Sequence, residues 1–258
     1  MEPRFEQFLR ERQYLHNVSS ATIQWYRESL CLLPCESPSQ EQLIETVIKM
    51  RERGRKATGC NVAIRAINSY MHWNSGTKRK CGSGCEHPRI QELKEPQEVL
   101  PTFSEAQIKR LVAAKPKGKY QRRTHLLALF LLDTGARISE ALGVRVRDID
   151  FDNLLVTLDG KGRKQRVVPF SFELRRALFL YCKESNHSPD HPLFASRMHT
   201  PLGRRDMLRD IKIHCERQGV IPPVRTLHAF RHTFAVNYLR RGGSVFHLQK
   251  SSVTAASI

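Results

Sequence analysis

Hydrophobic residues recur every three or four positions between residues 5 and 75, and polar turns separate the groups. This spacing is typical of amphipathic α-helices. Ser39, followed three residues later by Gln42, has the pattern of a capping box at the start of one helix. A further helix is predicted over residues 61–73. The first part of the chain is therefore predicted to be a small all-α domain.

Glycine and proline interrupt the helical pattern between residues 74 and 101, where charges of opposite sign also alternate. Such a composition is typical of linkers. We therefore predict a helical domain over residues 1–87, a linker over 88–101 and a second domain over 102–258.

The second domain combines helical spacing with one strand pair. Two short runs rich in valine and leucine, 154–158 and 166–169, flank a Gly-Lys-Gly turn and predict a β-hairpin. The predicted helices begin at Ser104 and continue over 126–132, 172–181, 204–217 and 226–241. The predicted fold class is mainly α with a small β-hairpin or sheet.

Charge indicates the kind of partner. Hydrophobic residues make up 40% of the 258 residues, enough for buried cores, and the net charge is +18. Such an excess predicts a polyanionic partner, either nucleic acid or an acidic membrane surface. Residues 101–258 carry 28 Lys and Arg against 13 Asp and Glu, so most of the excess lies in the second domain.

The sequence contains no apolar run long enough to span a bilayer, and its first residues, Met-Glu-Pro-Arg, do not begin a signal peptide. We therefore expect a cytoplasmic protein without a membrane partner. The seven cysteines are an odd number in a chain without an export signal, which favours free thiols over a disulfide framework.

Three segments of the second domain carry residues suited to phosphate chemistry. Arginine donates to two phosphate oxygens from a planar fork and stays charged, which suits Arg137 and Arg231 to neutralising a phosphodiester. Lys161, between two glycines, can give a proton to a departing sugar oxygen. His228 lies three residues before Arg231, so a helix places both on one face, and histidine shuttles protons near neutral pH.

Each of these residues alone is weak evidence, because exposed basic residues are common at helix starts and hairpin tips. Their order and flanking sequences are more specific. Thr-Gly-Ala-Arg-Ile-Ser-Glu (134–140), Gly-Lys-Gly-Arg-Lys-Gln-Arg-Val-Val-Pro (160–169) and Leu-His-Ala-Phe-Arg-His-Thr (227–233) together resemble the tyrosine recombinase, or phage integrase, family. The resemblance covers roughly residues 5–250.

The resemblance implies both a fold and an activity. It implies an N-terminal helical core-binding (SAM-like) domain that clamps DNA, followed by a mixed α/β catalytic domain. In the family, DNA strands are cleaved and rejoined through a phosphotyrosine without a metal or nucleotide cofactor. Arg137, Lys161, His228 and Arg231 match the catalytic positions of its motifs, and double-stranded DNA is the implied partner.

Other polar residues complete this assignment. Glu140 falls one helical turn after Arg137 and either orients its guanidinium or is a surface charge. Contacts to the DNA backbone are expected from Lys78, Arg79, Lys80, Arg163, Lys164, Arg240 and Arg241. The alternative for these basic residues is a solvated charged face.

The nucleophilic tyrosine of the family has no counterpart among the matched motifs. The family places a second His or Trp, and then the tyrosine, beyond the helix that carries His-x-x-Arg, whereas the similarity here ends near Lys250. Tyr238 would lie about 10 Å along that helix from Arg231, which suits packing better than attack. We therefore expect a truncated catalytic domain, through a frameshift, an early stop or a natural short form, with little strand exchange by this chain alone.

His72, Cys81, Cys85 and His87 form a cluster of metal-ligand types near the linker. Zinc takes such nitrogen and sulfur ligands, but the spacing is not that of a standard finger. Because reduced surface cysteines beside glycine are common, no metal is assigned and zinc is a secondary hypothesis.

Three functions remain open on the sequence: a recombinase of a mobile element, a non-catalytic DNA-binding module that occupies the recombination site, and a nonspecific nucleic-acid-binding protein. The missing tyrosine separates the first two, and preference for an inverted-repeat site separates the third. Because the last helix of the family commonly docks on a neighbouring subunit, we expect any homo-oligomer on DNA to be weakened.

Overall fold

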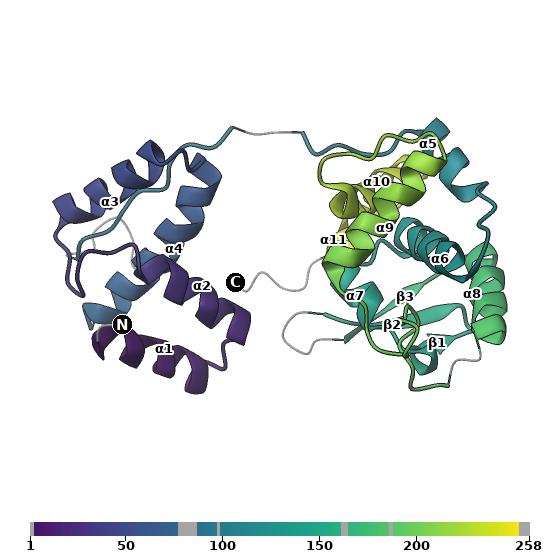
Figure 1. Cartoon of the computed structure of the whole chain (residues 1–258), viewed down its shortest axis with the longest axis horizontal. Coiled ribbons are helices and arrows are strands. Elements are labelled where there is room, and N and C mark those ends of the chain that lie inside the picture. Colours follow the sequence, from purple (N-terminus) through teal and green to yellow (C-terminus); the bar gives the residue numbers. More distant parts are fainter. Residues whose placement is uncertain (1–2, 77–86, 97–98, 161–164, 186–187, 253–258) are drawn as a thin grey trace. The chain divides into compact units, whose positions relative to one another are not determined.

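The computed structural model describes residues 3–76, 87–96, 99–160, 165–185 and 188–252. The chain divides into two compact units, Met1–Glu98 and Val99–Ile258, which we describe separately. Figure 1 labels their helices and strands. The helical content and the small antiparallel sheet confirm the predicted fold class.

The N-terminal unit contains α1 (Pro3–Tyr14), α2 (Ser20–Leu30), α3 (Gln40–Glu52) and α4 (Ala57–Asn74). Helix α4 contacts α2 and α3, and α1 packs on α2. The predicted capping box opens α3: the Ser39 hydroxyl accepts the Gln42 N–H (3.3 Å), and the Gln42 side chain accepts the Ser39 N–H (2.9 Å). Local sequence therefore sets where this helix begins.

Helix α4 supplies much of the core of this unit. Ile64, Ile67 and Tyr70 are fully buried and share one cluster with Phe8 of α1 and Leu43 of α3. The rings of Phe8 and Tyr70 meet edge to face, 5.4 Å between centroids. Helix α4 begins at Ala57, four residues before the predicted start, and this added turn buries Cys60 in the same core.

Part of the segment predicted as a linker is bound to α4. Asn61 donates to the Leu93 carbonyl and accepts the Leu93 N–H, both at 2.8 Å. Asn68 makes the same pair of bonds to Ile90, at 2.8 and 2.9 Å. Two asparagines, seven residues apart on one helix, therefore hold this part of the backbone to the unit. The N-terminal unit thus extends beyond the predicted boundary at residue 87.

The C-terminal unit is built around α6 (Lys119–Thr134), which is apolar on most sides. Its residues Leu127, Phe130 and Leu131 are fully buried. Five helices contact it: α5 (Glu105–Val112), α7 (Ile138–Gly143), α8 (Phe172–Ser185), α9 (Arg204–Arg217) and α10 (Thr226–Arg240). Helix α11 (Val245–Ser252) follows α10.

A three-stranded antiparallel sheet of order β1-β2-β3 lies in the described part of this unit. Its strands are β1 (Ile149–Asp150), β2 (Leu155–Asp159) and β3 (Gln165–Pro169), and a 3₁₀ turn, η1 (Val146–Asp148), precedes them. The predicted hairpin is β2–β3, with Val156 opposite Val168. Strand β1 was not predicted, because two residues are too few to show an alternating pattern.

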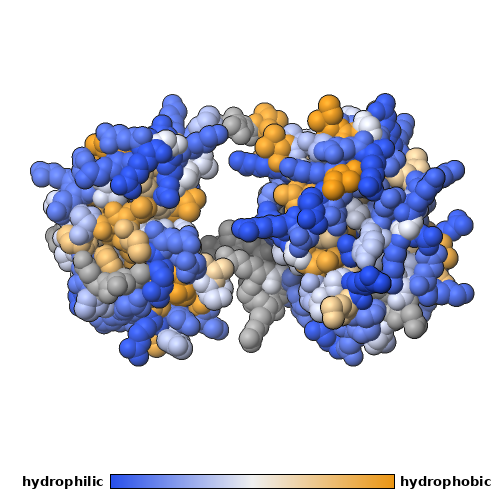
Figure 2. All heavy atoms as spheres, in the orientation of Figure 1, coloured by the Kyte–Doolittle hydropathy of each residue, from blue (hydrophilic) through white to orange (hydrophobic). Residues whose placement is uncertain are grey.

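Hydrophilic residues cover most of the visible surface of each unit, and smaller hydrophobic patches lie among them (Figure 2). In the part of the chain that the structure describes, no helix combines the length and hydrophobicity needed to cross a bilayer.

Candidate phosphate-binding site

The turn between α6 and α7 presents the first predicted arginine. Helix α6 ends at Gly135, whose φ of +61° lies in the left-handed region, and a Cβ there would come within 2.2 Å of the Phe234 ring on α10. The Thr134 hydroxyl accepts the Ala136 N–H (3.2 Å), which tightens the turn. This turn places Arg137 at the N-cap position of α7.

Glu140 occupies the centre of the site, and its side chain is only 2% exposed. Its Oε1 accepts from Arg137 Nη1 (2.8 Å), while its Oε2 accepts the Arg137 backbone N–H (2.8 Å) and Arg166 Nη2 (2.7 Å). Burial acts to raise the pKa of the Glu140 carboxyl, but the bonds from Arg137 and Arg166 outweigh it and the pKa is lowered. Glu140 is therefore a buried, ionised partner of Arg137, not an exposed charge on the helix surface.

Arg231 reaches the same turn from α10. Its Nη1 donates to the Gly135 carbonyl (2.5 Å), across 96 residues of sequence. Burial, followed by the charges of Arg137 and Arg166, lowers the pKa of the Arg231 guanidinium to about 10. The group still carries its charge at neutral pH. Three cations therefore gather around one carboxylate, and we call Arg137, Glu140, Arg166 and Arg231 the arginine cluster.

His228 precedes Arg231 by about one turn of α10, so the two project from similar faces. Burial lowers the pKa of the His228 imidazole, and the nearby charges of Arg204 and His232 lower it further. The ring is therefore neutral at pH 7 and able to accept a proton. Among these charges, that of Arg204, at the start of α9, has the largest effect on the pKa of His228. Arg204 therefore adds a cation near His228 to the three of the arginine cluster.

Sequence reasoning gave no role to Arg166, although the residue lies within the motif that supports the resemblance. On β3 it shares a face with the buried Val168, two residues on. A charged residue on the inward face of a strand was the signal that could have identified it, because such a charge needs a buried partner. Glu140 is that partner.

Several predicted residues lie outside the described residues: Lys161, Arg163, Lys164, Lys78, Arg79, Lys80, Cys81 and Cys85. The strands on either side of Lys161 are paired up to Asp159 and Gln165. Arg240 and Arg241 are exposed at the far end of α10, roughly 14 Å along its axis from Arg231. The structure therefore does not bring these two arginines to the arginine cluster.

Tyr238 lies seven residues after Arg231, a rise of about 10 Å along α10. Its ring packs against Phe234, with 6.0 Å between centroids, and covers Gly243, where a Cβ would meet the ring at 2.3 Å. This environment gives Tyr238 a packing role and separates its hydroxyl from a phosphate held by Arg231.

Two members of the predicted zinc cluster are described. The rings of His72 and His87 are 5.6 Å apart, and burial, followed by the charge of His72, lowers the pKa of His87. The two cysteines of the cluster lie outside the described residues. Among the residues that are described, no group of three or more His, Cys, Asp and Glu side chains could hold a metal ion. The zinc hypothesis therefore still depends on sequence spacing alone.

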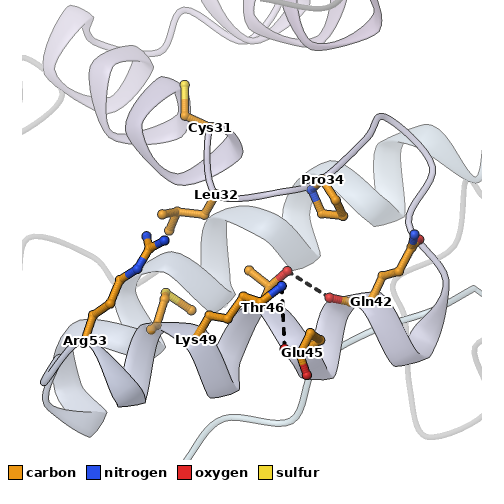
Figure 3. A pocket seen from close by; sticks show the side chains of 9 residues that line it. Cys31, Leu32, Pro34, Gln42, Glu45, Thr46, Lys49 and Arg53 are labelled. Carbon is orange, nitrogen blue, oxygen red and sulfur yellow. Dashed lines mark hydrogen bonds and ion pairs between the residues drawn. The ribbon is translucent and has the colours of Figure 1, made fainter.

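A surface hollow in the N-terminal unit, between α3 and the connection from α2, gathers a different set of side chains (Figure 3). Its polar groups largely pair within α3: Lys49 Nζ lies 3.5 Å from Glu45 Oε1, and the Thr46 hydroxyl donates to the Gln42 carbonyl (2.8 Å). Helix-internal pairing of this kind is ordinary surface structure. We therefore place the candidate site at the arginine cluster.

Arg137, Arg166 and Arg231 lie together near the turn between α6 and α7, an arrangement suited to neutralising a phosphate. The sequence model of the phage integrase family matches residues 101–252, more than half of the chain. The chain therefore belongs to the phage integrase family, and the predicted family is confirmed.

Tyrosine recombinases are similar along most of the chain. XerA of Pyrococcus furiosus is 26% identical over 241 residues, which cover 92% of this chain and 80% of that protein. XerC of Xanthomonas campestris pv. campestris is 28% identical over 255 residues, which cover 95% of this chain and 78% of that protein.

Solved structures share the fold. The Tn1549 transposon integrase in complex with transposon right end DNA has a TM-score of 0.74 at 20% identity, covering 96% of this chain and 90% of that chain. XerH recombinase bound to a palindromic difH substrate has a TM-score of 0.73 at 18% identity, and the match covers 98% of this chain and 77% of that chain. At these identities the likeness shows the fold alone.

Proposed function

We propose that the protein is a site-specific DNA recombinase that holds one phosphodiester of duplex DNA between Arg137 and Arg231. The observation that carries the proposal is the arginine cluster, in which Arg137 and Arg166 bond to one buried carboxylate and Arg231 bonds to the Gly135 carbonyl in the turn before Arg137. The net charge of +18 favours binding of a polyanion such as DNA. The names of the relatives and the DNA in the complexes of Tn1549 integrase and XerH support the same substrate.

In this proposal each group has one task. Arg137, whose side chain is 40% exposed, and Arg231 neutralise the non-bridging oxygens as charge develops on phosphorus. The neutral His228 would accept a proton from an attacking hydroxyl, which Tyr238 is not placed to supply, and Lys161 would donate one to the departing sugar oxygen. Glu140 holds Arg137 in place.

The N-terminal unit is proposed to clamp the duplex, as the resemblance implies. Lys78, Arg79, Lys80, Arg163, Lys164, Arg240 and Arg241 are the proposed backbone contacts. Assembly of more than one copy on a DNA site belongs to the same proposal, and the mass of the complex measures it. A cytoplasmic location is part of the proposal because the substrate is genomic DNA.

A second candidate function is site occupation without cleavage. The packed position of Tyr238, about 10 Å along α10 from Arg231, favours it because this hydroxyl is not placed to attack. The two functions can be distinguished by whether a covalent protein–DNA adduct forms. A covalent protein–DNA adduct on a nicked duplex carrying the recombination site indicates recombinase chemistry, whereas binding without an adduct indicates site occupation.

Phosphate binding itself is tested with variants that remove one charge each. The affinity for a fluorescently labelled duplex of about 30 base pairs is measured by anisotropy over a range of salt concentrations. We expect R137Q and R231Q each to weaken binding roughly 10-fold or more and to lower the salt slope by about 0.9.

Arg176→Gln is the matched control, because it removes the same charge from an exposed position on α8. Equal effects of R137Q, R231Q and R176Q on affinity and salt slope would show that the arginine cluster is not a phosphate site.

A further inference from the structure

We infer that Arg166 is a positioning residue that sets the orientation of Arg137 through Glu140. The inference rests on the proposed function, since it specifies how one of the two phosphate-binding arginines is held.

The three residues come from two elements, α7 and β3, and the Glu140 carboxylate joins them. Arg137 flanks α7 in the turn after α6, Glu140 lies in the first turn of α7, and Arg166 lies on β3, where Leu158 of β2 pairs with it. Arg166 Nη2 donates to Glu140 Oε2 (2.7 Å) while Arg137 Nη1 donates to Oε1 (2.8 Å). The Glu140 carboxylate therefore links Arg166 of the hairpin to Arg137.

Exposure separates the tasks of the two guanidinium groups. The Arg137 side chain is 40% exposed, whereas that of Arg166 is 18% exposed and its partner Glu140 is 2% exposed. A ligand phosphate approaching from solvent therefore meets Arg137 more readily than Arg166. Arg166 pairs with the buried carboxylate of Glu140 at 2.7 Å.

Competition for Glu140 explains what Arg166 does. Arginine prefers to bind a carboxylate with two parallel bonds, one to each oxygen. In the structure, Oε2 is taken by Arg166 and by the Arg137 backbone N–H, so Arg137 Nη1 binds at Oε1. Without Arg166, Oε2 becomes available and the Arg137 guanidinium is expected to turn toward Glu140 and away from solvent. Arg166 thus keeps Arg137 facing the phosphate.

A double-mutant cycle on DNA affinity tests this coupling. We expect R166Q to weaken binding of the labelled duplex about 3- to 10-fold, and R166K, which keeps the charge but not the fork, to weaken it less. In the R137Q background, R166Q should have no further effect, and R166Q alone should lower the salt slope by much less than R137Q does. Effects that multiply in the double variant, with equal losses of salt slope, would show Arg166 to be a separate phosphate ligand and overturn the inference.

A readout without DNA separates this inference from the proposed function. The Nε–Hε resonance of Arg137 in a ¹⁵N NMR spectrum, assigned by its loss in R137K, should shift in R166Q but not in the control R176Q. An unchanged resonance in R166Q overturns the inference even if DNA binds. If the wild-type protein does not bind duplex DNA, the proposed function fails, and the resonance still decides whether Arg166 positions Arg137. Should R166Q not fold, R166K carries the same comparison.

Discussion

A pair of histidines buried between α6 and α9 makes the stability of the C-terminal unit depend on pH. The rings of His125 and His214 are 5.4 Å apart, and His214 is only 6% exposed. Among the described atoms, neither His125 Nδ1 nor His214 Nε2 has a hydrogen-bond partner. Burial lowers the pKa of His214 to about 4, and the charges of His125 and Arg217 contribute to the shift.

The size and sign of the effect follow from this shift. The pKa of His214 falls from 6.5 to about 4 on folding, and each unit corresponds to about 1.4 kcal/mol. Above pH 6.5 both states are neutral, and the histidine has no effect on the pH dependence. As the pH falls below 6.5, the unfolded state binds a proton first, so the free energy of unfolding decreases until about pH 4. The full loss is about 3 kcal/mol.

Replacing His214 with phenylalanine keeps a ring but removes the titration. We expect the free energy of unfolding of the wild type, relative to H214F, to fall by about 3 kcal/mol between pH 7 and pH 4. Both tryptophans, Trp25 and Trp73, belong to the N-terminal unit, so their fluorescence follows that unit alone. Hydrogen exchange of the α9 amides therefore serves as the measurement for the C-terminal unit.

Two comparisons make the result decisive. The exposed His247 provides the matched control, since H247F should leave the pH dependence unchanged. The reasoning is refuted if the difference between the wild type and H214F is the same at pH 7 and pH 4, because burial would then not be suppressing the protonation of His214.

Three further substitutions test other features. Gly135→Ala should destabilise the C-terminal unit by about 3 kcal/mol, through its left-handed backbone and contact with Phe234, and weaken DNA binding; a melting temperature equal to that of the wild type contradicts this. Asn61→Ala should cost about 2 kcal/mol and speed proteolysis near Leu93, because two backbone bonds are lost; unchanged cleavage rates argue against the attachment. Tyr238→Phe should leave DNA affinity unchanged, and a large loss in an anisotropy titration would assign the hydroxyl a role at the phosphate.

The longer elements were predictable because their physical signals are local. A capping box fixes the start of α3, and helical spacing identified α4 and α10, although α4 begins one turn earlier than predicted, with Cys60 buried in the core. Strand β1 and helix α7 have two and six residues, too few for periodicity to be recognised. Tertiary contacts, not sequence pattern, define them.

In the candidate site, too, some features could be predicted from local sequence and others depend on tertiary contacts. Arg137, His228 and Arg231 were proposed from motif order, and the structure places Arg137 and Arg231 at one turn. The bonds of Glu140 and the presence of Arg166 could not be derived from spacing, because β3 and α7 meet only in the folded unit. Burial of a charge is set by neighbours that are distant in the sequence.

The C-terminal unit is closed by bonds between its two ends, which affects the order of folding during synthesis. The Phe103 N–H donates to the buried Thr233 hydroxyl (2.9 Å), across 130 residues, and Arg231 bonds to Gly135. The N-terminal unit finds all its core partners within its first 98 residues and can fold while the ribosome continues. The C-terminal unit cannot complete the packing around α6 until α10 has been made, because α10 contacts α6 directly. A nascent chain halted before α10 therefore exposes that apolar helix, and we expect chaperones to bind it at this stage.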